Sequence, residues 1–318
     1  MSRTIGLRRG AALLLTVFAL LVPVTSCASR SPSGQQPPST DDPAAAFPVR
    51  IELSGQDPVT LPEQPKRIVS LSPTATEVLY AIGAGDQVVA VDENSDYPPR
   101  APREDFSALN VNAGAVSEYD PDLVIAQAGG ADSLAAELRE VDVPVLLTPS
   151  AENLRDAYEQ IRTLGKATGH GEGADDTVER MRSELDELAR KTPRPEEGTT
   201  YYHEVGPNHY AASSTSFVGS VYEKFGLTDS IADSAEGKFP KLSEEEILRA
   251  DPDMIFLADT EAGVTADKVA ERPGWDSLTA VRRGRVHELD DDTASRWGPR
   301  VVEFARDVSE AIRSARED

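Results

Sequence analysis

Two histidines and a glutamate lie within seven residues of one another, at His203, Glu204 and His209. Imidazole nitrogens and carboxylate oxygens are ligands for transition metals, so this segment is a candidate for binding a metal or a ligand. A Gly-Pro pair between them would break the helix on which zinc peptidases carry their two histidines. Two interpretations stay open: a polar loop that follows a strand at 199–202, or a segment in which these side chains and Tyr210 contact a ligand.

The sequence contains no residues with the spacing of a common catalytic or nucleotide-binding motif. It has no GxxxxGK[ST] phosphate loop, no GxSxG nucleophile turn, no GxGxxG dinucleotide loop and no HExxH zinc motif. The three aspartates at 290–292 lack the alternation and the glycine of an EF-hand calcium loop. We therefore expect no enzymatic activity, with a secreted hydrolase or a signalling or adhesion module as remote alternatives.

Two segments of the chain repeat nearly the same phrase. DPDLVIA at 120–126 returns as DPDMIFLA at 251–258, which is 131 positions later. A short apolar run entered through Asp-Pro-Asp is typical of a buried strand that follows a turn, since proline restricts φ and aspartate favours turns. The repetition predicts two lobes with the same order of elements.

A second pair of segments supports the same repeat. EVLYAIGAGD at 77–86 and SVYEKFGLTD at 220–229 each place a glycine at the same position, where a helix can end in a left-handed conformation. Thr74 and Glu77 have the spacing of a capping box at the start of the first of these helices. Two repeats are too few for a solenoid, so the pattern indicates two similar α/β lobes.

A long amphipathic helix is predicted between the two repeats. In the segment 172–191, Val178, Met181, Leu185 and Leu188 recur at intervals of three or four residues, with charged residues between them. Twenty residues at 1.5 Å each give a helix of roughly 30 Å. We expect this single helix to join the two lobes and to limit hinge motion between them.

The first fifty residues have the layout of an export signal and a tether. Three arginines precede an apolar run at 11–22, which is too short to span a bilayer comfortably. The only cysteine, Cys27, follows in the sequence VTSC, which resembles the lipidation site of bacterial lipoproteins. Residues 28–48 contain five prolines and few apolar side chains, as an extended tether would.

The predicted divisions follow from these signals. They are a lipoprotein signal peptide at 1–26, a lipidated cysteine and tether at 27–48, an N-terminal α/β lobe at 49–150, a helical linker at 151–194 and a C-terminal α/β lobe at 195–318. The chain carries 55 acidic residues against 32 Lys and Arg, a formal net charge of −23. Binding to nucleic acid requires cationic surfaces, so this charge argues against it. We expect a monomer anchored by lipid to the outer face of the cell membrane.

Five segments resemble the cobalamin-binding and ferric-siderophore-binding proteins of ABC importers. They are KRIVSLSPTATEVLYAIGAGDQVVAV (66–91), NSDYPP (94–99), DPDLVIA, FPKLSEEEIL (239–248) and the final GRVHEL with RWGPR (284–289 and 296–300). The resemblance covers about 60–315. It implies two α/β lobes with a ligand cleft between them, a metal chelate as the ligand, no intrinsic cofactor, and an ABC permease with its ATPase as partners.

The resemblance also carries over particular positions of the cleft. The residues that match the family's ligand-binding positions are Asn94, Gln127, Tyr210, Phe239, Asp292, Thr293 and Arg296. Asn94 and Gln127 replace aromatic walls of cobalamin-binding members, whereas Arg296 and the adjacent Trp297 suit an anionic chelate. Trp297 is alternatively a core residue of the last helix. Ferric siderophore and cobalamin both remain candidates, and haem or a bare metal held by His203, Glu204, His209 or Tyr210 is the alternative within the class.

Members of this family dock on the permease through an acidic residue on each lobe, which the resemblance places at Glu245 in the second lobe. Ser243 and Glu246 have the spacing of a capping box, which leaves Glu245 free for a partner. The matching position in the first lobe is Gly114, so Glu118 is the nearest candidate there.

Overall fold

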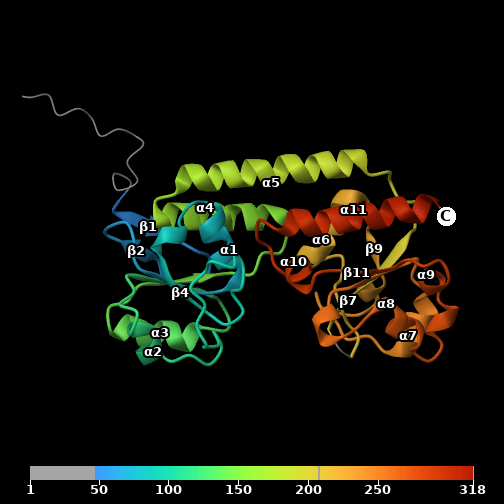
Figure 1. The fold of residues 1–318 in the computed structure, drawn as a ribbon, viewed down its shortest axis with the longest axis horizontal. Coiled ribbons are helices and arrows are strands. Elements are labelled where there is room, and N and C mark those ends of the chain that lie inside the picture. Colours follow the sequence, from blue (N-terminus) through green and yellow to red (C-terminus); the bar gives the residue numbers. More distant parts are fainter. Residues whose placement is uncertain (1–46, 207, 318) are drawn as a thin grey trace, which may run out of the picture. The chain divides into compact units, whose positions relative to one another are not determined.

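The computed structural model describes residues 47–206 and 208–317, all within one compact unit of the chain, residues 40–318. The predicted signal peptide, the lipidated Cys27 and most of the tether lie outside the described residues. Within the described part, no helix has the length and apolar character needed to cross a membrane. The fold has two α/β lobes, as the repeat predicted (Figure 1).

The N-terminal lobe is built on a four-stranded parallel sheet in the order β4-β3-β5-β6. All side chains of β3, β6 and most of β4 and β5 are buried, because helices cover both faces of a parallel sheet. An antiparallel hairpin precedes the sheet. The elements are β1 (Val49–Ile51), β2 (Val59–Leu61), β3 (Ile68–Leu71), α1 (Pro73–Ala81), η2 (Gly85–Gln87), β4 (Val88–Val91), α2 (Ala113–Ser117), β5 (Leu123–Gln127), α3 (Asp132–Glu140) and β6 (Val145–Thr148).

The C-terminal lobe contains a five-stranded sheet in the order β11-β10-β7-β8, with β9 also paired to β7. Only β8 runs antiparallel to its neighbour. The elements are β7 (Thr200–Gly206), β8 (Tyr210–Ala211), α6 (Phe217–Phe225), β9 (Asp229–Ser230), η3 (Ile231–Ser234), α7 (Glu244–Ala250), β10 (Met254–Leu257), η4 (Thr260–Ala262), α8 (Ala266–Ala270), η5 (Trp275–Ser277), α9 (Thr279–Arg282), β11 (Val286–Glu288), α10 (Asp291–Ser295) and α11 (Val301–Glu317).

The internal repeat is confirmed at the level of strand pairing. The parallel order β4-β3-β5-β6 of the first lobe corresponds to β9-β7-β10-β11 of the second. The register corresponds as well, since Ile68 pairs with Leu123 and Tyr201 pairs with Met254. Each lobe therefore presents the carboxyl ends of its parallel strands at one edge of its sheet.

The repeated Asp-Pro-Asp phrase has one structural cause in both lobes. Asp120 and Asp251 each have a positive φ, of 45° and 46°, and terminate the turn that follows α2 or α7. The next aspartates, Asp122 and Asp253, accept hydrogen bonds from backbone N–H groups at the start of the adjacent strand. The first aspartate thus allows the chain to turn. The second holds the strand that follows it, β5 or β10, against the neighbouring strand, β3 or β7.

The helix signals were partly right. α1 and α6 are followed by Gly83 and Gly226, which have φ values of 93° and 89°, as the shared glycine predicted. The capping box predicted for Thr74 and Glu77 is wrong, because α1 begins two residues earlier and Ser72 is its N-cap, accepting from the backbone N–H of Ala75. Glu77 lies in the second turn of α1 and is free for another role.

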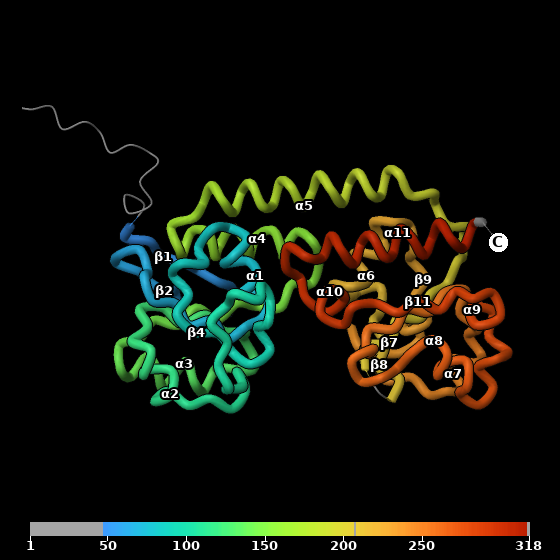
Figure 2. Tube along the Cα trace, in the orientation of Figure 1, coloured from blue at the N-terminus to red at the C-terminus, as the bar shows by residue number. Residues whose placement is uncertain are grey.

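The helix α5 (Gly171–Lys191) connects the lobes and packs on α4 (Leu154–Thr168). The predicted 20-residue helix is α5, and it contacts α1 and α4 of the first lobe and α11 of the second (Figure 2). At Gly173 a Cβ would lie 2.1 Å from the carbonyl oxygen of Ile82, so only glycine permits this close approach to the end of α1. One continuous apolar core includes Val78, Val178 and Val308, from α1, α5 and α11.

Candidate functional site

Polar groups of the first lobe lie at the carboxyl end of its sheet, where ligands bind in open α/β folds. Gln127 is the last residue of β5, is half-buried, and donates from Nε2 to Ser150 Oγ over 2.8 Å. Asn94 is exposed in the loop after β4, and its backbone N–H donates to the Asp92 carboxylate. These two positions supply neutral hydrogen-bonding groups rather than aromatic walls.

The second lobe contributes two half-exposed aromatic side chains. Tyr210 and Phe239 expose 46% and 49% of their surface. They lie on antiparallel segments joined by hydrogen bonds from Ala211 N to Pro240 O and from Ser213 N to Lys238 O. Tyr210 pairs with Lys241, so the period-2 alternation of extended chains places both rings on the same face, as diagonal neighbours.

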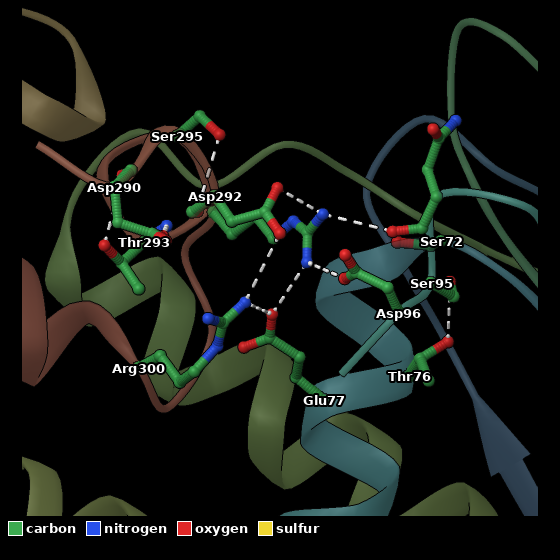
Figure 3. Close-up of polar contacts among 12 residues, drawn as sticks. Ser72, Thr76, Glu77, Ser95, Asp96, Asp290, Asp292, Thr293, Ser295 and Arg300 are labelled. Atoms are coloured by element: carbon green, nitrogen blue, oxygen red, sulfur yellow. Dashed lines mark hydrogen bonds and ion pairs between the residues drawn. The ribbon is translucent and has the colours of Figure 1, made fainter. Parts of the chain in front are cut away.

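An ion-pair cluster around Arg296 joins the two lobes. Figure 3 shows its other members Glu77, Asp96, Asp292 and Arg300. The Arg296 guanidinium donates to Glu77 Oε1 at 3.1 Å, to Asp96 Oδ1 at 3.3 Å and to the Asn94 carbonyl at 3.1 Å, and it also contacts the Asp292 carboxylate. Glu77, Asp96 and Asn94 belong to the first lobe. The cluster therefore connects α1 and the loop after β4 to the segment that follows α10.

Arg300 is the second cation of this cluster. Its Nη2 donates to Glu77 Oε1 over 2.6 Å, and its guanidinium carbon lies 4.3 Å from the centre of the Tyr97 ring. Burial opposes its charge, but the hydrogen bond and charge of Glu77 outweigh that effect and raise the pKa of Arg300. Burial raises the pKa of Asp292 to about 6 even though Arg296 and Arg300 act in the opposite direction.

These contacts change the interpretation of three predicted ligand residues. Arg296 has an exposed side-chain fraction of only 12% and its donors already meet four acceptors, so it holds the lobes together instead of presenting a free cation. Asp292 is engaged with it. Trp297 lies between α10 and α11, not within the last helix, and its indole N–H donates to Gln160 Oε1 over 2.8 Å.

The histidine and glutamate segment is part of the second sheet and not a loop. β7 continues to Gly206, which places His203 and Glu204 in the lobe interior with no exposed surface. His203 Nδ1 lies 2.8 Å from the Tyr222 hydroxyl, and burial lowers the pKa of His203 to about 3. The hypothesis that His203 and Glu204 bind a ligand is corrected here, because neither side chain reaches a surface.

Glu204 is paired within the lobe. Both of its carboxylate oxygens accept from Arg272, each at 2.7 Å, and the guanidinium of Arg272 lies over the ring of Trp275. His209 stacks on Trp275, with 5.7 Å between the centres of the two rings. Among the described residues, no group of three His, Cys, Asp or Glu side chains is placed to hold a metal ion.

Asp259 is buried beside this pair without a partner for its carboxylate in the described structure. It is 3% exposed, and neither carboxylate oxygen accepts a hydrogen bond from the described residues. Burial and then the charge of Glu204 raise the pKa of Asp259 to about 7. Its ordinary pKa is near 3.8, so between these two values the folded protein holds a proton that the unfolded chain releases.

This raised pKa predicts a pH-dependent stability. The free energy of unfolding should fall as the pH rises from about 4 to about 7, because ionising Asp259 is less favourable in the folded protein. Asp259→Asn should weaken that dependence and stabilise the protein at pH 8 by about 1–3 kcal/mol, the usual cost of an unsatisfied buried polar group. Urea unfolding at pH 5 and pH 8 tests this, with the exposed Asp276→Asn as the control. Equal pH dependence in all three proteins would contradict the assignment.

The predicted docking helix has the expected geometry in the second lobe. Ser243 is the N-cap of α7, and it forms a capping box with Glu246. Glu245 is left on the surface with 84% of its side chain exposed, and its only ion pair among the described residues is to Arg249 at 2.7 Å. The S-x-x-E spacing thus distinguishes the capping acid Glu246 from the exposed acid Glu245.

The first lobe repeats this helix without the exposed acid. α2 precedes β5 as α7 precedes β10, and its N-cap Asn112 accepts from the backbone N–H of Ala115. The 131-residue offset of the repeat places Gly114 where the second lobe has Glu245. Glu118 is exposed at the end of α2, one helical turn away.

The ion pairs of Glu77 with Arg296 and Arg300 were not predicted from the sequence. A signal was present, since Glu77 is the only charged residue of the segment 68–85 and a buried glutamate needs a cation, and RWGPR places two arginines four residues apart. The sequence does not show that these groups meet, because Arg296 and Arg300 lie 219 and 223 residues from Glu77 in the chain.

Two lobes with the same parallel α/β topology, connected by a long helix, have the architecture of a two-lobed solute-binding protein. The chain belongs to the periplasmic binding protein family, whose model matches residues 68–293.

Individual relatives agree with that assignment. The chain is 31% identical over 302 residues to an uncharacterized ABC transporter substrate-binding lipoprotein, YvrC, of Bacillus subtilis, covering 92% of this chain and 94% of that protein. It is 29% identical over 315 residues to a cobalamin-binding protein of Halobacterium salinarum, covering 93% and 83%. The periplasmic heme-binding protein RhuT from Roseiflexus sp. RS-1 in its apo form superposes with a TM-score of 0.68, at 26% identity, covering 79% of this chain and 98% of RhuT.

Proposed function

We propose that this protein is the extracytoplasmic receptor of an ABC importer and that it delivers a metal chelate to the permease. The family and the naming of the Bacillus subtilis relative as a transporter lipoprotein support the transport role. The same name supports anchoring through Cys27, with the protein acting as a monomer beside a permease and its ATPase. No catalytic activity is assigned to it.

The aromatic pair formed by Tyr210 and Phe239 is the observation that favours a large chelate. Two half-exposed rings on one face bury a large apolar area against a flat or ring-rich ligand. Gln127, Ser150 and Asn94 supply hydrogen-bonding groups from the first lobe. Cobalamin and a ferric siderophore both combine such surfaces, and the Halobacterium salinarum relative is named for cobalamin.

Haem is the alternative, because RhuT is named as a heme-binding protein and shares this fold. A bare metal ion is disfavoured by the described part of the chain, where no three metal-ligating side chains converge and His203 and Glu204 are buried. His209 is also directed to a stacking contact with Trp275. We therefore rank a chelate above an ion.

A thermal-shift screen tests the proposal. Residues 49–318 should be stabilised by one of cobalamin, a ferric hydroxamate or haem, by roughly 2.7 kcal/mol at a hundredfold excess over Kd, and not by iron or zinc salts alone. Tyr210→Ala with Phe239→Ala should weaken that binding about tenfold or more, because aromatic stacking adds about 0.5–1.5 kcal/mol per pair beyond buried area.

Val141→Ala is the matched control, since Val141 is an exposed apolar residue at the end of α3. It should leave the affinity unchanged. If the aromatic double variant binds as tightly as the control, these rings do not contact the ligand. If only metal salts stabilise the protein, the chelate assignment is wrong.

A further inference from the structure

A cavity of about 810 Å³ lies in the second lobe at the amino ends of β7, β10 and β11. It is thus at the opposite edge of the sheet from the carboxyl ends, where we place the solute. Its walls come from the segment after α5, the starts of these strands and the ends of α9 and α11 (Figure 1). The charged residues of its lining are Arg282, Arg283, Arg285, Arg316, Glu196 and Asp253.

Four arginines converge on this cavity in a strongly acidic protein. Arg282, Arg283 and Arg316 are exposed and Arg285 is half-buried, whereas the chain as a whole carries −23. Every arginine ion pair found among residues 47–206 and 208–317 involves other arginines. The cavity therefore has a local excess of positive charge in the described structure.

The lining also contains two acidic residues, so four positive charges face two negative ones. The Asp253 carboxylate accepts from the backbone N–H and the hydroxyl of Thr200, at 3.0 and 3.2 Å, which holds β10 against β7. Glu196 is exposed in the segment after α5 and, within the part of the chain that the structure describes, has no ion pair with the four arginines. Asp253 directly precedes β10, and Glu196 lies in the segment between α5 and β7. Both acids therefore belong to the wall that these segments form.

Arg285 is held in a fixed orientation with a donor to spare. Its Nη2 donates to the carbonyl oxygen of Ala315 over 2.6 Å, which ties the segment before β11 to the end of α11. Its Nε is buried without a hydrogen-bond partner among the described residues. Arg285 lines the cavity, and its anchor on Ala315 limits the positions that its guanidinium can take.

Helix dipoles account for part of the arrangement. Arg282 and Arg316 lie in the last turns of α9 and α11, where a cation interacts favourably with the negative end of the helix. That effect does not explain Arg283 or Arg285, which follow α9 and border the same cavity. A planar guanidinium forms two parallel hydrogen bonds to carboxylates and phosphates, so several of them around one cavity suit a multiply charged oxyanion.

We propose that this cavity binds a phosphate-bearing anion, at a site separate from the one that holds the transported solute. Arg282, Arg283 and Arg316 form its charged rim, and Arg285 forms its fixed inner donor. The phosphate group belongs to a soluble compound or to the headgroup of an anionic lipid at the membrane surface. Both sources present negatively charged phosphate oxygens. A soluble compound carries two or more charges on one molecule, whereas a membrane of anionic lipids carries many singly charged phosphates close together.

Binding of inorganic pyrophosphate to the full chain tests the site in solution, by calorimetry at constant ionic strength. The variant Arg282→Gln/Arg283→Gln should bind at least about tenfold more weakly, since it loses charge-assisted hydrogen bonds. Arg50→Gln/Arg155→Gln is the matched control, because it removes the same charge from exposed arginines of the first lobe. Its affinity should equal that of the wild type.

Co-sedimentation with phosphatidylglycerol vesicles, compared with phosphatidylcholine vesicles, distinguishes the two sources. Binding of pyrophosphate that depends on Arg282 and Arg283 identifies a soluble phosphate compound. Retention on phosphatidylglycerol vesicles alone, lost in the same variant, identifies a lipid headgroup. If neither probe binds, or if the variant and the control lose binding equally, the proposed site is wrong. Melting temperatures of both variants should match the wild type, since all four substituted side chains are exposed.

Discussion

Replacing Glu77 with alanine should lower the free energy of unfolding by about 3–5 kcal/mol, the usual result of removing one partner of a buried ion pair. The Glu77 side chain is 2% exposed and accepts from both Arg296 and Arg300. Without it, these cations keep only the more exposed Asp96 and Asp292 as charged partners in the described structure. The loss should appear in urea unfolding at neutral pH.

Two further variants make this prediction specific. Glu77→Gln keeps an acceptor oxygen for the arginines and should cost less than the alanine variant. Glu303→Ala removes an exposed acid from the first turn of α11 and should change stability by less than about 0.5 kcal/mol.

A double-mutant cycle of Glu77→Ala with Arg300→Ala should be strongly non-additive, because the two side chains share a hydrogen bond. Additive losses would show that the pair does not interact in solution.

Replacing Glu245 with alanine should reduce solute uptake at least about tenfold while leaving folding and solute affinity unchanged. The side chain is exposed, and under the proposed function it pairs with a cation of the permease, an interaction whose loss costs about 2 kcal/mol or more. Its ion pair with Arg249 is exposed, and such pairs contribute little to stability. Uptake by cells that carry the permease, melting temperature and Kd are the three measurements.

The neighbouring Glu246 is the matched control for Glu245. Glu246→Ala removes the capping box of α7 and should lower the melting temperature, while uptake per folded molecule stays normal. The capping contact also lowers the pKa of Glu246, so the two acids differ in chemistry although they are adjacent. Normal transport by Glu245→Ala, or a failure that follows from unfolding, would remove Glu245 as the docking acid.

The sequence determined the features that depend on neighbouring residues. The Asp-Pro-Asp turns, the glycines after α1 and α6, and the capping box of α7 all form from groups within a few residues of each other. Backbone conformational preferences and hydrogen bonds between residues close in the sequence suffice to specify them. Because the same local signals occur twice in the same order, the amino-acid sequence by itself also predicts the two-lobed organisation.

Only the tertiary structure decided which polar residues are available to a ligand. His203 and Glu204 are ligand candidates by residue type, yet β7 continues through them and the packing of α6 and η5 around the sheet buries both. Arg296 suits an anionic chelate by its charge, yet it meets Glu77 across 219 residues of chain. Tyr210 and Phe239 become neighbours through strand pairing between distant segments. Burial and long-range pairing depend on how the complete chain packs, and side-chain type at one position does not encode them.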